Sequence, residues 1–275
     1  SLTAAPPVDT ERCRIVAVAN QKGGVGKTTT TINLAASLSE LGARVLIVDL
    51  DPQGNAATGL GIDHDRRELT AYDLLDGGDP IAEIAQPTSV PGLDIIPATQ
   101  DLSSVDVDFV DDPHRARRLS ARLKLTLPRD RWDILLFDCP PSLNLLTVNA
   151  LAASDSILVP LQCEFFAMEG LTQLLETLKQ IRTSVNPDLQ VAGIVLTMYD
   201  RRNRLSELVA ADVRAAFGDD VFRTVIPRNV RLSEAPSHAL PATTYDPQSS
   251  GALAYRALAR EYLERSGASH LAVAP

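Results

Sequence analysis

The chain is poor in cysteine, in aromatic residues and in long hydrophobic runs. Its three cysteines, Cys13, Cys139 and Cys163, lie far apart without a CxxC pair, which argues against a disulfide framework and a zinc site. Aromatic residues make up 4% of the chain, so its core must come mainly from aliphatic side chains. No apolar run approaches the roughly 18 residues of a membrane-spanning helix. The first residues also lack the charged and apolar regions of a signal peptide. These absences favour a protein of the reducing cytoplasm.

Lysine is scarce as well, and its placement is informative. The 275 residues include four lysines, of which Lys22 and Lys27 fall within six positions. The net charge of −9 argues against a protein that is basic all over, but it does not exclude a local basic patch. With 45% hydrophobic and 22% charged residues, the composition is typical of a globular protein with a sizeable core.

Short apolar runs alternate with longer helix-like stretches along the chain. The expected strands are residues 15–19, 45–48, 93–96, 134–137, 157–160, 191–197 and 224–226. The expected helices are residues 28–41, 114–127, 143–152, 168–183, 206–217 and 251–265. Continuous apolar strands indicate burial on both faces. The alternation therefore predicts an α/β fold, a doubly wound, mostly parallel sheet with helices on both faces. We expect one domain over residues 12–265, between flexible tails at 1–11 and 266–275.

A glycine-rich segment follows the first expected strand and opens the first expected helix. Backbone N–H groups and a helix N-terminus converge on an anion at such a place. Lys27 can reach the β- and γ-phosphates, and the Thr28 hydroxyl can bind Mg²⁺. The general GxxxxGK[ST] pattern would have glycine at position 21, where this chain has Gln21 followed by a second lysine. A dinucleotide fingerprint fits less well, because Thr29 stands where a third glycine is expected. The residues expected to hold the nucleotide here are Lys22, Gly23, Gly24, Val25, Gly26, Lys27, Thr28 and Thr29.

Two aspartates follow other expected strands. Asp138 comes directly after residues 134–137, where a Walker B aspartate holds Mg²⁺ directly or through water; a helix cap or turn is the simpler alternative. Asp51 lies just beyond residues 45–48, within reach of a γ-phosphate. Asp49 is better suited to a structural role at the strand end, and spacing leaves open whether it shares the role of Asp51.

The variant loop KGGVGKTT resembles the deviant Walker A motif of the ParA/MinD class of P-loop ATPases. Four further segments extend the likeness, at residues 48–55, 137–142, 162–170 and 225–237. In order and type, these motifs resemble the chromosomal, Soj-type ParA partition ATPases over residues 14–262. The resemblance implies a P-loop NTPase fold that binds ATP and Mg²⁺.

The resemblance also assigns roles to single residues. It implies that Asp51 positions and polarises the attacking water, and that Lys22 reaches the partner's nucleotide across an ATP-sandwiched homodimer. Pro227 and Asn229 are the implied adenine contacts. No NKxD motif is present, which favours ATP over GTP. The family further implies slow basal turnover, stimulation by a ParB-type centromere-binding protein, and a cytoplasmic, nucleoid-associated location.

Arginines form two groups. The first lies on residues 115–131 among leucines, and its default interpretation is a solvated helix face. The second includes Arg202 and Arg231, whose counterparts in ParA relatives bind DNA without sequence specificity; plain surface charge is the alternative. No helix-turn-helix or stacking aromatic residues accompany them, so we expect non-specific double-stranded DNA as the ligand.

Three other functions share these motifs. A MinD-like ATPase would bind membrane through a cationic amphipathic C-terminal helix, but residues 253–263 have the pattern of a packed core helix, so we expect no membrane partner. An iron–sulfur protein of the same fold would need a second motif cysteine beside Cys139. A regulator without ATPase activity is disfavoured by four intact residues, Lys27, Thr28, Asp51 and Asp138.

Overall fold

The computed structural model describes residues 12–271. The expected N-terminal tail, residues 1–11, and residues 272–275 lie outside this part. An eight-stranded sheet has the order β3-β4-β2-β5-β1-β6-β7-β8, and all neighbours are parallel except β3 and β4. The strands are β1 (Arg14–Val18), β2 (Val45–Asp49), β3 (Gln86–Pro87), β4 (Leu93–Ile96), β5 (Ile134–Asp138), β6 (Ser156–Gln162), β7 (Gln190–Tyr199) and β8 (Val221–Pro227).

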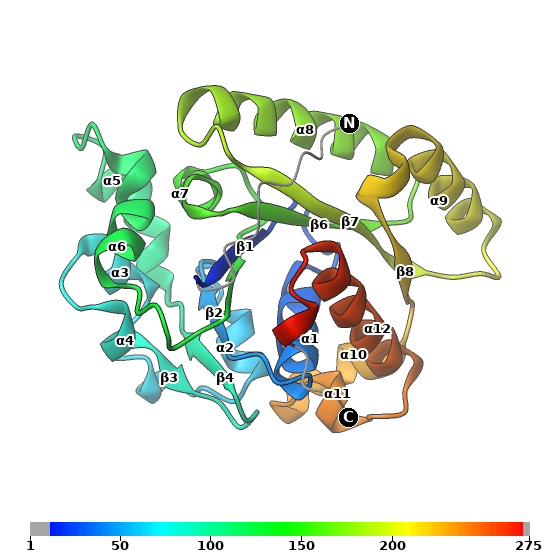
Figure 1. Cartoon of the computed structure of the whole chain (residues 1–275), viewed down its shortest axis with the longest axis horizontal. Helices are drawn as coiled ribbons and strands as arrows, with labels where there is room; N and C mark the ends of the chain where they lie inside the picture. The colour runs from blue at the N-terminus through cyan, green and yellow to red at the C-terminus, as the bar shows by residue number, and fades with distance from the viewer. Residues whose placement is uncertain (1–11, 272–275) are drawn as a thin grey trace.

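Helices cover both faces of this sheet. In Figure 1, α7 and α8 lie on one side of the sheet, whereas α1 and α12 lie on the other. The helices are α1 (Lys27–Glu40), α2 (Asn55–Gly59), α3 (Ala71–Asp76), α4 (Ile81–Ile84), α5 (Val105–Asp108), α6 (Arg118–Thr126), α7 (Leu145–Ala153), α8 (Ala167–Ser184), α9 (Arg204–Phe217), α10 (Val230–Glu234), α11 (Ala242–Tyr245) and α12 (Ser250–Arg265). The predicted fold class is confirmed.

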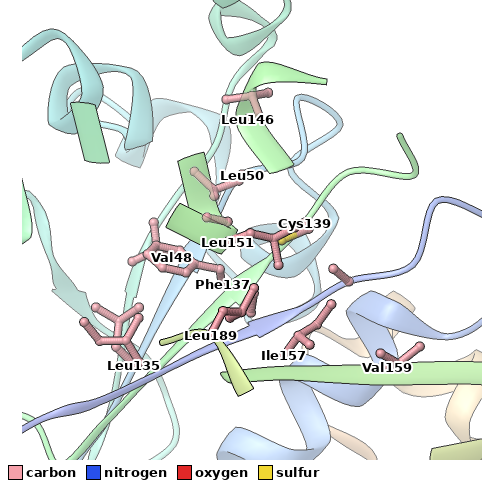
Figure 2. Packing of buried hydrophobic residues seen from close by; sticks show 14 of the residues in the cluster. Val48, Leu50, Leu135, Phe137, Cys139, Leu146, Leu151, Ile157, Val159 and Leu189 are labelled. Carbon is pink, nitrogen blue, oxygen red and sulfur yellow. The ribbon is translucent and has the colours of Figure 1, made fainter. Parts of the chain in front are cut away.

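The core consists of two layers, one on each face of the sheet. Alternate residues of β1 divide between them, with Ile15 and Ala17 in one layer and Val16 and Val18 in the other. Figure 2 shows part of the first layer, where Phe137 of β5 lies close to Leu151 of α7. Strands that are buried on both faces explain why the sequence shows continuous apolar runs rather than alternation.

The strand register brings three strand ends level. Val18 of β1 and Asp49 of β2 both pair with Asp138 of β5. Because these strands are parallel, the segments that follow them emerge at one edge of the sheet. The loops that carry the candidate residues therefore meet there.

The structure corrects two expectations. The basic stretch 114–127 is a 3-10 turn, Arg115–Arg117, followed by the shorter helix α6. Its arginines do not form a plain solvated face, because Arg118 donates to the backbone oxygen of Leu75 and Arg122 to that of Asp79. The packed region also continues beyond Arg265, where we expected it to end, since Ala268 is buried.

Candidate functional site

The glycine-rich loop has the backbone of an anion cradle. Gly24 and Gly26 have φ angles of +74° and +88°, in the left-handed region that favours glycine. Gly26 is the N-cap of α1, and no side chain caps this helix, so the N–H groups of its first turn remain for a bound anion. The loop is fixed from outside by Thr197 of β7, whose hydroxyl donates to the Val25 oxygen at 2.8 Å.

Lys27 lies inside this loop. Only 7% of the residue is exposed, and its Nζ donates to the backbone oxygen of Lys22 at 2.6 Å. Burial lowers the pKa of Lys27, while the nearby carboxylates of Asp138 and Asp51 act in the opposite direction. A phosphate bound in the loop would add a further anion beside this ammonium group and oppose the effect of its burial.

Asp138 is fully buried and faces the start of α1. It accepts hydrogen bonds from the hydroxyls of Thr28 at 2.8 Å and Thr31 at 3.2 Å. Burial raises its pKa, and the two hydroxyls oppose that shift only in part. The alternative of a helix cap is wrong, because Asn144 caps the following helix, α7.

Asp49 and Asp51 differ in what occupies their carboxylates. Asp49 is completely buried, and it accepts the N–H groups of Asp51 at 3.1 Å and Ala57 at 3.4 Å, so it holds the turn after β2. Burial and the neighbouring Asp138 raise its pKa. Asp51 is 9% exposed and accepts the Gln53 N–H at 3.0 Å. Asp49 therefore has the surroundings of a structural residue, and Asp51 lies nearer to solvent at the sheet edge.

Lys22, the unusual lysine of the loop, has a carboxylate partner of its own. Its ammonium group pairs with Glu164 in the loop between β6 and α8, and its side chain is 45% exposed. Gln21 ties the phosphate loop to the first turn of α8 by donating to the Gly170 oxygen at 3.1 Å. Phe165 and Phe166 are exposed beside this pair. Glu164 belongs to the motif at residues 162–170, but the sequence does not predict this contact, because nothing in the chain spacing places Glu164 near Lys22.

Pro227 ends the last strand, β8, and Asn229 follows it at the same edge of the sheet. The Asn229 oxygen caps α10 by accepting the Arg231 N–H at 2.9 Å, and its Nδ2 donates to Ser250 at 2.6 Å. The amide of Asn229 thus serves the local fold. A groove of about 270 Å³ lies elsewhere beside the phosphate loop, between Thr28, Thr29, Asn55 and Pro236.

The two candidate DNA-binding arginines follow neighbouring parallel strands. Tyr199 of β7 pairs with Pro227 of β8 at the strand ends, so Arg202 and Arg231 both emerge at this edge of the sheet. Arg202 pairs with Asp200, yet its side chain is 86% exposed. Arg231 pairs with Glu234 and Asp246. Each cation is available at the surface but has a carboxylate neighbour of its own.

Comparisons with known proteins find relatives along most of the chain. Residues 13–191 match a protein-family model described as an AAA domain. The chain is 55% identical over 252 residues to the chromosome partitioning protein ParA of Caulobacter vibrioides, covering 92% of this chain and 94% of that protein. It is 49% identical to the sporulation initiation inhibitor protein Soj of Bacillus subtilis, covering 90% and 97%.

Solved structures show the same architecture. A cobyrinic acid a,c-diamide synthase from Mycobacterium smegmatis, crystallised with an ATP analogue and magnesium, has a TM-score of 0.79 and 38% identity, covering 90% of this chain and 92% of that one. The cell division ATPase MinD of Pyrococcus furiosus has a TM-score of 0.75 and 28% identity, covering 91% and 98%. Both the sequence and the fold therefore have close relatives along most of the chain.

Proposed function

The chain belongs to the ParA/Soj family of chromosome-partitioning proteins, and we propose that it is a Mg²⁺-dependent ATPase whose nucleotide state controls its binding to DNA. The observation that carries this proposal is the meeting of three strand ends. They place the phosphate loop, the turn that holds Asp51 and the buried Asp138 at one edge of the sheet.

The residues present fit ATP and Mg²⁺. The loop offers uncapped N–H groups and a buried ammonium group to the phosphates. Thr28 and Asp138 supply the hydroxyl and carboxylate oxygens that Mg²⁺ prefers. Among residues 12–271 no group of three or more His, Cys, Asp or Glu side chains is placed to hold a metal by itself. The metal would therefore depend on the phosphates as well, as it does in P-loop ATPases, where it neutralises charge on the β- and γ-oxygens.

Three side chains have separate roles in phosphate binding, hydrolysis and dimer formation. Lys27 faces the β- and γ-phosphates, and Asp51 orients and polarises the water that attacks the γ-phosphate. Lys22 leaves Glu164 and adds a positive charge to the nucleotide of a second copy, so that an ATP-sandwiched homodimer forms. Adenine lies against the loop that contains Pro227 and Asn229. These roles imply slow turnover in the free protein.

DNA binding and release complete the proposed cycle. The ATP dimer binds double-stranded DNA without sequence specificity through Arg202 and Arg231. A ParB-type centromere-binding protein stimulates hydrolysis, and the monomers then leave the DNA. In this role the protein is cytoplasmic and associated with the nucleoid.

The MinD-like alternative has less support. Helix α12 is packed into the core through Tyr255, Leu258 and Tyr262, so it is not a free amphipathic helix. None of the helices in residues 12–271 is both long enough and apolar enough to span a bilayer, a property that a helix lying on the membrane surface does not require. An iron–sulfur role is also disfavoured, because Cys139 and Cys163 are buried free thiols, and burial raises the pKa of both.

Retention on DNA tests the proposal directly. The protein is passed over immobilised double-stranded DNA with ATP, with ADP and without nucleotide, and the same samples are pelleted with anionic liposomes. We expect retention on DNA in ATP only and no pelleting with liposomes. ATP-dependent pelleting without DNA retention would replace this function by the membrane-binding one.

A further inference from the structure

Arg67 is a buried cation for which the proposed reaction has no use. It follows the 3-10 turn His64–Arg66, and 6% of the residue is exposed. Its nearest acidic influences, Asp49 and Asp63, act on it through space, and no ion pair of Arg67 with a carboxylate occurs among residues 12–271. Burying a cation without a paired carboxylate costs folding free energy. Its hydrogen bonds are therefore expected to hold an arrangement that an apolar side chain could not hold.

The guanidinium group joins three segments. Nε and Nη2 donate to the Ile62 oxygen at 3.1 and 2.8 Å, and Nη1 donates to the Ala98 oxygen at 3.1 Å. Nη2 also donates to the Thr58 hydroxyl at 2.9 Å. Arg67 therefore links the last turn of α2 to the loop that follows it and to the chain beyond β4.

The same contacts lead to Asp51. The Thr58 hydroxyl donates to the backbone oxygen of Gly54 at 3.1 Å, and the Gly54 N–H donates to the backbone oxygen of Asp51 at 2.9 Å. Gly54 has a φ of +66°, and a Cβ atom there would collide with Arg67 Nη1, so the guanidinium packs directly on this turn. Asp49 holds the segment from the other side through the Ala57 N–H.

We propose that Arg67 is a positioning residue for Asp51. Its planar fork fixes the backbone of residues 51–58, so that the Asp51 carboxylate stands where it can orient the attacking water. This inference rests on the role proposed above for Asp51. A lysine has the charge but not the fork, and it could not hold three segments at once.

The hydrogen bonds of Arg67 to Ile62, Ala98 and Thr58 form what we call the Arg67 brace. Two variants test this brace. Arg67→Lys keeps the charge and removes the fork. Thr58→Val removes the hydroxyl that accepts from Arg67 and donates to Gly54, without changing the shape of the side chain. Thr183→Val is the matched control, because Thr183 makes a similar bond to the Lys179 oxygen on the exposed side of α8. Kinetics of ATP hydrolysis, ATP affinity and melting temperature are measured for all three and for Asp51→Ala.

A positioning role predicts a split between kcat and KM. We expect kcat to fall about tenfold in Arg67→Lys and Thr58→Val, because small displacements of a catalytic group are costly. KM and ATP affinity should stay within about twofold of wild type, since the phosphate loop is untouched. Thr183→Val should behave as wild type. If Arg67→Lys does not fold, Thr58→Val alone decides.

Two results would overturn the brace. One is full kcat in both brace variants beside an inactive Asp51→Ala, and the other is a parallel loss of ATP affinity and melting temperature, which would mark a merely structural arginine. Wild-type turnover in Asp51→Ala would instead overturn the role proposed for Asp51. The two failures are therefore distinguishable.

Discussion

At the scale of single residues, surroundings separate side chains that the sequence presents as equivalent. Asp49 and Asp51 lie two positions apart. The carboxylate of Asp49 accepts hydrogen bonds from two backbone N–H groups, whereas Asp51 lies closer to solvent. Lys22 and Lys27 likewise point to different partners, Glu164 and the loop backbone. Substitutions at these positions should therefore have distinct effects.

Replacing Asp51 by alanine should stop hydrolysis and leave ATP binding intact. The attacking water loses its partner, and general-base assistance of this kind contributes about 10²-fold or more to a rate. We expect an ATP-bound dimer that stays on DNA, measured by single-turnover hydrolysis and size-exclusion chromatography. A protein that remains monomeric in ATP would contradict this role.

Replacing Lys22 by alanine should separate nucleotide binding from assembly. A monomer should still hold ATP through Lys27 and Thr28, but dimers should no longer form in ATP, because the charge supplied to the second nucleotide is missing. Lys179→Ala, on the exposed side of α8, is the matched control. Normal dimers of Lys22→Ala with normal stimulated turnover would make Lys22 an ordinary loop lysine that pairs with Glu164.

At the scale of elements, a buried carboxylate joins α12 to β8. Glu261 is 4% exposed and accepts the N–H groups of Arg223 at 2.7 Å and Thr224 at 2.9 Å. It also pairs with Arg265 on its own helix. Burial alone would raise the pKa of Glu261, but these hydrogen bonds outweigh it and lower the pKa. The ionised form is thus the one that stabilises the edge of the sheet.

Glu261→Gln should lower the free energy of unfolding by about 1–3 kcal/mol at pH 7, because an N–H donor loses its acceptor. A carboxyl with a depressed folded pKa stabilises the protein above its unfolded value of roughly 4.3 and loses that effect as pH falls through the folded value. The difference from wild type should therefore shrink towards pH 3. Urea unfolding at several pH values measures it, and Glu264→Gln, at an exposed neighbour, is the control. A pH-independent difference would contradict this account.

The longer elements could be predicted from the sequence, and the shorter ones could not. Seven strands and six helices have strong apolar patterns, since strands buried on both faces leave continuous runs. Helices α2 and α10 have five residues each, too few for a periodic signal. The contacts of Lys22 with Glu164 and of Arg67 with Thr58 were missed for another reason: they join residues whose proximity depends on the fold of the loops.

At the scale of the whole molecule, the proposed DNA binding requires a local basic patch, because the protein is acidic overall. Arg202 and Arg231 lie at one edge of the sheet, and each is partly neutralised by carboxylates. If a dimer presents both pairs to one duplex, log affinity should fall with log salt at a slope of roughly −3 to −4.

Arg202→Ala should flatten that slope by about 2 and weaken binding to all sequences alike, because each dimer loses two phosphate contacts. ATP affinity and dimerisation should survive. Fluorescence anisotropy with a labelled duplex over a range of salt concentrations measures the effect. Arg129→Ala is the control, because Arg129 lies at the opposite edge of the sheet near Arg14 and Arg44. An unaltered slope in the Arg202→Ala, Arg231→Ala double variant would make the patch plain surface charge.

The scarcity of lysine has a practical consequence for following the nucleotide cycle. Lys22 is partly exposed, Lys27 is buried in the phosphate loop, and Lys124 and Lys179 are exposed elsewhere. Amine-selective acylation, measured by mass spectrometry, would therefore report on dimer formation through Lys22. Lys124 and Lys179 would serve as internal references in the same molecule. ATP should slow the modification of Lys22 relative to Lys124 and Lys179, and hydrolysis should restore it.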